Sequence, residues 1–195
     1  MPVRFMITAA ILAVSPVTGV AQPLPPDCST VPAPKQPVEV SVGGTRLAPK
    51  SMKLIPVGTI TFGDEKFDSY RLSLRSVDSI SAPLEAEVTV VVPKGQRVDG
   101  RVFRRIPTRE IGKQPLATAG MPEVQGWSLR NRPANANLNH VRYVASLRLE
   151  FGQRQGATIP GNIYLCVARG QKSTFDKAPT QEDGIVAGTF EARIQ

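Results

Sequence analysis

Two cysteines, Cys28 and Cys166, could act either as nucleophiles or as the two halves of a disulfide. A catalytic thiol needs a histidine nearby as its base, and the chain of 195 residues contains one histidine, His140. An even number of cysteines in an exported chain is normally a paired one. We therefore predict that Cys28 and Cys166 form a disulfide that holds the fold, with a bridge to another molecule as the alternative.

Serine, histidine and metal chemistry have weak support. Ser128 in GWSLR follows a glycine, but this motif lacks the closing glycine of a nucleophile elbow. His140 ends the asparagine-rich stretch NANLNH, and this setting is typical of a surface residue. The chain has neither a histidine pair nor a CxxC motif, so we predict no zinc site and no cofactor.

Acidic side chains gather at two places, GDEKFD (Asp64, Glu65 and Asp68) and QEDG (Glu182 and Asp183). Neither cluster has the ligand spacing of a known calcium loop, and turn formation explains both. A pair of carboxylates that the fold brings together, as in glycoside hydrolases, stays open as the source of an activity.

Basic residues concentrate in the segment from Arg97 to Arg154. It holds eleven basic residues, ten of them arginine, against four acidic ones, whereas the rest of the chain after residue 21 is balanced. The planar fork of arginine suits carboxylate, sulfate and phosphate. We predict an anion-binding surface, with two aromatic rings, Phe103 and Trp127, as stacking surfaces for a ligand. Its proposed binding residues are Arg101, Arg104, Arg105, Arg109 and Trp127.

The alternative interpretation of this segment is that its arginines are solvated on exposed strand faces, where they protect sheet edges from pairing. No nucleic-acid-binding motif accompanies the basic residues, and we expect no nucleic acid among the partners. An acidic polymer of the cell envelope or a partner protein is the expected class.

The first 21 residues have the layout of a secretory signal peptide: a basic residue at Arg4, an apolar run over 6–14, and small residues before a cleavage point after Ala21. The apolar run is shorter than the roughly 20 residues of a membrane-spanning helix. An uncleaved anchor is the alternative. Lipidation is not expected, because Cys28 follows PPD rather than a small-residue box. We predict a secreted or periplasmic protein without a transmembrane span after cleavage.

Hydrophobic side chains recur with a period of two along several segments, which is the pattern of half-buried strands. In PLEAEVTVVV the alternate apolar residues run from Leu84 to Val92, and the last residues lose the alternation, as in a strand covered on both sides. VRYVASLRLEF alternates in the same way over 141–151. GTITFGDEKFDSYRLSL predicts a hairpin with its turn at Gly63 to Lys66. The other predicted strands are 38–42, 101–106, 123–130, 159–167 and 185–194.

Many short strands separated by turn signals predict an all-β domain. We expect an antiparallel β-sandwich, immunoglobulin-like or jelly-roll-like, because the many prolines favour edges and corners over a closed barrel. The expected organisation is a signal peptide over 1–21, a proline-rich lead over 22–37 and one sandwich domain over 38–195. The last three strands should form an antiparallel meander, with Cys166 in its middle strand.

The strand over 101–106 places Arg101 and Arg105 on one face with Phe103, and Arg104 on the other. Because two arginines are harder to bury than one, we expect Val102 and Ile106 to face the core and Arg104 to lean outward at a strand end or bulge. Two functions remain: an exported, non-enzymatic module that binds a partner protein or an anionic glycan, and a small secreted glycan hydrolase with a carboxylate pair.

Overall fold

The structure is a computed structural model that describes residues 28–105, 123–140, 143, 145–167 and 184–195. The described residues form eleven strands and no helix, so the predicted all-β class is confirmed. The strands are β1 (Glu39–Val42), β2 (Thr45–Leu47), β3 (Ser51–Phe62), β4 (Glu65–Arg75), β5 (Leu84–Pro93), β6 (Val102–Arg105), β7 (Val124–Asn131), β8 (Ala136–Asn139), β9 (Ala145–Phe151), β10 (Thr158–Val167) and β11 (Gly184–Ile194).

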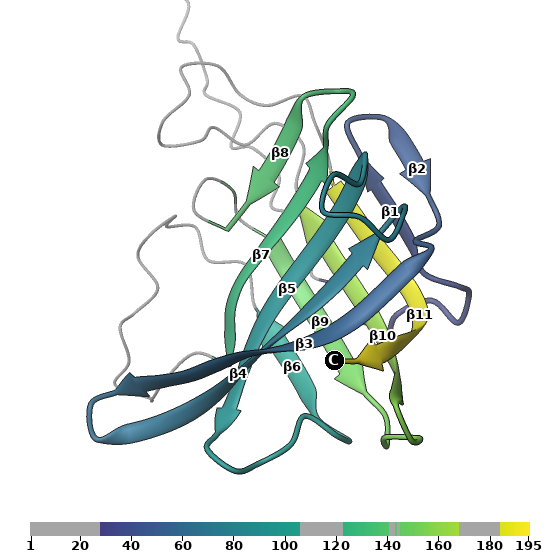
Figure 1. Cartoon of the computed structure of the whole chain (residues 1–195). Coiled ribbons are helices and arrows are strands. Elements are labelled where there is room, and N and C mark those ends of the chain that lie inside the picture. The colour runs from purple at the N-terminus through teal and green to yellow at the C-terminus, as the bar shows by residue number, and fades with distance from the viewer. Residues whose placement is uncertain (1–27, 106–122, 141–142, 144, 168–183) are drawn as a thin grey trace, which may run out of the picture.

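Neighbouring strands run in the order β6-β9-β10-β11-β3-β4-β5-β7-β8, with β1 and β2 added beside β11. In Figure 1 the strands β3, β4, β5, β7 and β8 form the front layer, and β6, β9, β10, β11 and β1 lie behind it. The layers join where β11 pairs with β3 at Arg193↔Lys53. This pairing is parallel, whereas we expected antiparallel strands throughout. Contacts between strands so far apart in sequence leave no trace in local periodicity.

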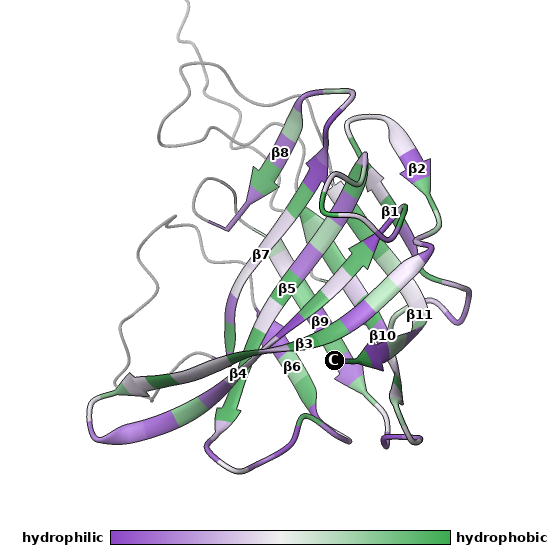
Figure 2. Cartoon of the chain, viewed as in Figure 1, coloured by the Kyte–Doolittle hydropathy of each residue, from purple (hydrophilic) through white to green (hydrophobic). Residues whose placement is uncertain are grey.

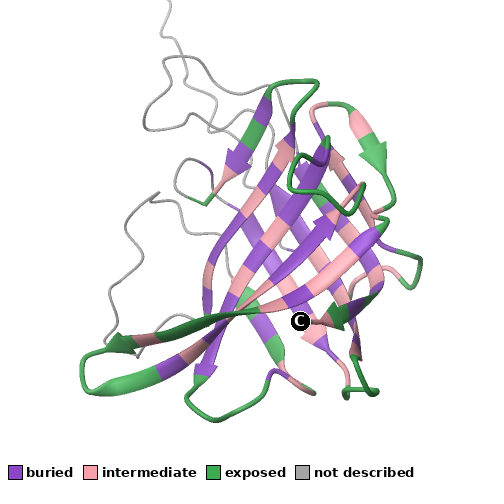
Figure 3. Ribbon diagram, in the orientation of Figure 1, coloured by how far each residue is buried: buried purple, intermediate pink, exposed green. Residues whose placement is uncertain are grey.

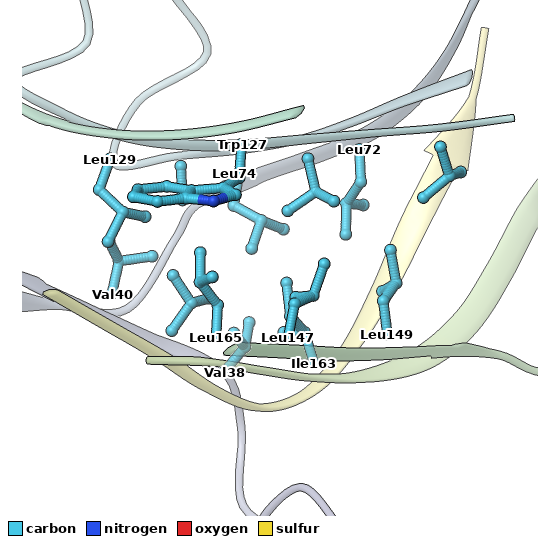
Figure 4. Packing of buried hydrophobic residues seen from close by; sticks show 14 of the residues in the cluster. Val38, Val40, Leu72, Leu74, Trp127, Leu129, Leu147, Leu149, Ile163 and Leu165 are labelled. Carbon is cyan, nitrogen blue, oxygen red and sulfur yellow. The ribbon is translucent and has the colours of Figure 1, made fainter. Parts of the chain in front are cut away.

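The core lies between the two layers (Figure 4). Leu72 of β4 and Trp127 of β7 project from one layer toward Leu147 of β9 and Ile163 of β10 in the other. Along β5 the predicted inward residues from Leu84 to Val92 are all buried. Figure 2 shows the alternation of apolar and polar residues that produces this burial. Asn131 of β7 also donates a 3.0 Å hydrogen bond across the layers to the Val42 carbonyl of β1.

The predicted meander is present: β10 pairs antiparallel with β9 on one side and β11 on the other, so Cys166 lies in its middle strand. A disulfide joins Cys166 to Cys28, with Cα atoms 6.1 Å apart. The bond lies on the outer face of the rear layer, because Ser146, Cys166 and Ile185 are in register there. Cys28 in the lead therefore lies on that face, and the end of the lead contacts β11, where Thr189 N–H donates to the Gln36 carbonyl at 2.7 Å.

The predicted hairpin is β3 and β4, closed by a turn at Gly63 and Asp64. Short β2 and β8 were not predicted. Within the described residues, no helix is long and apolar enough to cross a membrane. The predicted signal peptide, Arg109, Ile106 and the acidic pair Glu182 and Asp183 all lie outside the described residues.

Candidate anion-binding surface

The outer face of β6 and β9 brings two arginines together. In the antiparallel register, Arg104 of β6 lies directly opposite Arg148 of β9, and Val102 lies opposite Glu150. Arg104 and Val102 are exposed, whereas Arg148 and Glu150 are half-buried. Like charges directly opposite each other on a sheet are destabilising unless another group compensates them.

Glu150 compensates one of these two charges. Arg148 donates from Nε to Glu150 Oε1 at 2.6 Å, and its terminal nitrogen contacts the same oxygen. Asn162 Nδ2 of β10 donates to the other carboxylate oxygen at 3.3 Å. Within the described part of the chain, Arg104 has no carboxylate at ion-pair distance. One arginine is thus neutralised and held in place, while the other carries a free positive charge.

Arg105 lies on the opposite side of β6 from Arg104, on the face of Phe103. Phe103 is buried against Phe151, with ring centroids 6.0 Å apart. Arg105 is half-buried, and desolvation lowers the pKa of its guanidinium from the ordinary value. The guanidinium still stays charged at neutral pH. A desolvated cation without a carboxylate partner in the described residues adds positive potential at this end of the layer.

The expected orientation of β6 was wrong. Val102 is 42% exposed and Phe103 is 1% exposed, so the strand turns Phe103 to the core rather than Val102. The aromatic ring removes more apolar area from water than valine does, and its burial outweighs the partial desolvation of Arg105 beside it. Arg104 does point outward, as expected. Arg101 shares the inner side, and its guanidinium contacts the side chain of Gln96.

Neither predicted stacking ring is available to a ligand. Trp127 is 2% exposed and lies in the core between the two layers (Figure 4). Phe103 and Trp127 both fill the hydrophobic core between the layers. Of the predicted site residues, Arg101, Arg104 and Arg105 lie in β6 and the loop before it, but Arg104 is on the opposite side of the strand from Arg105, and Trp127 is in the core.

A cleft of about 350 Å³ adjoins Glu150 on the rear layer. Its polar lining comes from Glu150, Asn162 and Thr189 on β9, β10 and β11. Gly161 lies in its lining as well, and a side chain there would clash with the Glu150 carbonyl 2.5 Å away. This cleft and the role of Arg148 were not predicted, because the register of β10 against β9 and the pairing of β6 with β9 arise only in the folded chain. The one available signal was the alternation of Arg148 and Glu150 on the polar side of their strand.

A second cleft, of about 210 Å³, lies on the front layer and includes His140 and Ser128. The His140 ring rests against Gly126, where an added Cβ would lie 2.8 Å from its Cε1. Glu87 lines the same cleft and forms ion pairs with Arg71 at 3.7 Å and Arg75 at 3.5 Å. The neighbouring Glu85 is buried and accepts a 2.5 Å hydrogen bond from Arg75.

Comparison of the chain with protein-family models, with curated proteins and with solved structures finds no match. The described residues also contain no group of three or more metal-ligating side chains.

Proposed function

We propose that this protein is an exported, non-enzymatic binding module for an anionic glycan. The observation that carries the proposal is that a positively charged surface and a cleft adjoin each other on the rear layer. Arg104, which has no carboxylate partner within the described residues, lies opposite Arg148, which is bonded to Glu150, and Glu150 lines the cleft beside Asn162 and Thr189. Arginine supplies contacts to sulfate or carboxylate groups, and the amide, hydroxyl and carboxylate groups supply hydrogen bonds to sugar hydroxyls.

A glycan fits this arrangement better than a protein does. A protein interface usually has an apolar centre with large buried side chains, whereas this cleft is compact and places Glu150, Asn162 and Thr189 where they can bond sugar hydroxyls. Phe103 and Trp127, the two rings predicted as stacking surfaces, are buried in the core and are not available to anchor a protein partner. A partner protein remains the competing occupant in the experiment below.

Export is part of the proposal. The Cys28–Cys166 disulfide supports it, because disulfides persist in oxidising compartments and are rare in the cytosol. The segment before residue 28 has the composition of a cleaved signal.

The hydrolase alternative gains no support. A glycoside hydrolase needs two carboxylates flanking one bond, and the two clefts described above are each lined by a single carboxylate, Glu150 or Glu87. Both carboxylates are also paired with arginines.

The test is binding to immobilised heparin, a sulfated glycan, over a series of salt concentrations. Arg104→Glu should weaken binding roughly fivefold or more at low salt, because it replaces an attractive contact by a repulsive one. Asn162→Ala should weaken binding without changing its dependence on salt. The matched control is Arg46→Glu, the same charge reversal on β2, where Arg46 is exposed and paired with Glu39.

Equal losses from Arg104→Glu and Arg46→Glu would reduce the interaction to general attraction between a cationic protein and a polyanion. If neither variant loses heparin binding and an envelope protein binds tightly to the unaltered chain, the partner at this surface would be a protein rather than a glycan.

A further inference from the structure

Strands β3 and β4 continue beyond the rest of the sheet as a two-stranded arm, visible at the lower left of Figure 1. On the β4 side, pairing with β5 ends at Phe67↔Pro93. On the β3 side, β11 pairs only with Lys53 and Leu54, and Gln195 N–H makes a further bond to the Leu54 carbonyl. In the described chain, residues 55–62 of β3 therefore have a strand partner on one edge only.

This free edge lacks the charged residues that commonly protect an edge strand against pairing. Its sequence, IPVGTITF, contains no charged residue, whereas free edges normally carry charges that deter another strand. Val57 is 56% exposed and Phe62 is 37% exposed, and Figure 3 shows the arm as the longest exposed part of the strands. Pro56 and the bulge at Gly58 interrupt the edge at its root. The four residues from Thr59 to Phe62 remain regular.

The backbone groups of Thr61 point along this free edge. Lys66, which lies opposite Thr61, has its carbonyl directed toward β5, where it accepts a 2.9 Å bond from Lys94 N–H. In an antiparallel pair, two opposite residues either both bond each other or both turn away. Thr61 therefore turns its N–H and carbonyl away from β4, and so does Thr59, two residues before it. A donor and an acceptor are in place for another strand.

The charges at the two ends of the arm complement each other. At the tip, Asp64 and Glu65 are exposed and have no ion pair within the described residues. At the root, Lys53 is paired with Asp78 at 2.7 Å, but Arg193 of β11, in register with it, is exposed and has no ion pair within the described residues. An antiparallel pairing of two identical arms about a two-fold axis places each acidic tip beside the basic root of the other copy. A second copy of this chain thus has both the uncharged edge and the matching charges.

We infer that the arm of β3 and β4 pairs with the arm of a second copy, edge to edge and antiparallel, to form a two-fold dimer. Strand β3 of each copy adds to the sheet of the other through the backbone groups of Thr59 and Thr61. Phe62 and Val57 of the two copies then lie against each other's arms. This dimer involves a different surface from the arginines of β6, and its existence does not depend on the proposed glycan binding.

Sedimentation of the purified, disulfide-intact protein over a range of concentrations tests the inference. We expect a monomer–dimer equilibrium for the unaltered protein. Thr61→Pro removes the backbone N–H of residue 61 in both copies, so the two-fold dimer loses two hydrogen bonds. The dimer dissociation constant should therefore rise roughly 30-fold. The substitution leaves the β3–β4 bonds intact, and an unchanged circular dichroism spectrum would verify this.

Charge reversal gives a second route that does not alter the backbone. Glu65→Lys and Arg193→Glu should each weaken the dimer, and the two substitutions together in one chain should restore part of the loss. Glu39→Lys on β1 is the matched control and should leave the dimer unchanged. A protein that stays monomeric at all concentrations overturns the inference, and so does a Thr61→Pro variant that dimerises as well as the unaltered chain.

Discussion

The backbone N–H of Cys28 donates a 2.8 Å hydrogen bond to the side-chain oxygen of Ser146, 118 residues further along the chain. Both residues are buried on the outer face of the rear layer, next to the Cys28–Cys166 disulfide. The start of the lead is thus held to the sheet twice, once covalently and once by a buried hydrogen bond. Ser146 lies on an outer sheet face and is nevertheless buried, because the segment around Cys28 covers it.

Ser146→Ala should destabilise the protein by about 1–3 kcal/mol, because it leaves the Cys28 N–H buried without this acceptor. Chemical denaturation of the variant and the unaltered protein measures the difference. Ser128→Ala, on the half-buried outer side of β7, is the control and should change stability by less than about 0.5 kcal/mol. Equal effects of the two substitutions would contradict a special role for the Cys28–Ser146 contact.

Replacement of Cys166 by serine should lower the melting temperature by several degrees. The disulfide closes a loop with a sequence separation of 138 residues, which corresponds to about 5 kcal/mol in the chain-entropy model. Thiol labelling of the denatured, unreduced monomer should detect no free cysteine. Two labelled thiols per chain in the unaltered protein would contradict the intramolecular bond.

Gly161→Ala should destabilise the fold by about 2 kcal/mol or more, since the added Cβ overpacks a site that cannot expand. The new atom would lie 2.5 Å from the Glu150 carbonyl oxygen and would also clash with the Phe190 ring. Gly152→Ala is the graded comparison, because its nearest neighbour is the Pro160 ring at 3.0 Å. The melting temperature of Gly161→Ala should be well below that of Gly152→Ala. The reverse order would show that the backbone around Gly161 shifts to accommodate the added methyl group.

Asp68→Asn should lower the melting temperature near neutral pH but not in acid. The Gly95 N–H and then the Thr59 hydroxyl hydrogen-bond the carboxylate of Asp68, and together they hold its pKa below the ordinary value. A lowered folded-state pKa gives stability that is present above the unfolded-state pKa, about 3.9, and is lost as the pH falls through the folded-state value.

The difference in melting temperature between Asp68→Asn and the unaltered chain should accordingly disappear as the pH falls below the folded-state pKa of Asp68. Glu191→Gln, at an exposed position on β11, should show no such gap at any pH. A gap for Asp68→Asn that persists in strong acid would mean that its cause is not the ionised carboxylate.

Export should remove residues 1–21 and leave Gln22 as the first residue. The apolar run over 6–14 and the small residues up to Ala21 determine this cleavage point. Mass spectrometry of the exported fraction measures it directly. A mature form that still begins at Met1 would indicate an uncleaved anchor.

Period-two alternation determined by itself which side of the central strands is buried. From Leu84 to Val92 in β5, and from Leu147 to Phe151 in β9, every inward assignment agrees with the structure. Many alternating apolar residues along a strand leave only one face that can be buried. The two cysteines were predicted to pair with each other, with a bridge to another molecule as the alternative, and the structure pairs them with each other.

Tertiary structure decided what local pattern left ambiguous. In the four-residue strand β6, Phe103 competes with Val102 for the core, and only the neighbouring Phe151 ring settles that Phe103 is inside. The pairing of Arg104 with Arg148 and the parallel contact of β11 with β3 join segments far apart in sequence. Such contacts depend on which strands become neighbours when the two layers close, and a periodicity measured along one strand carries no information about the strand beside it.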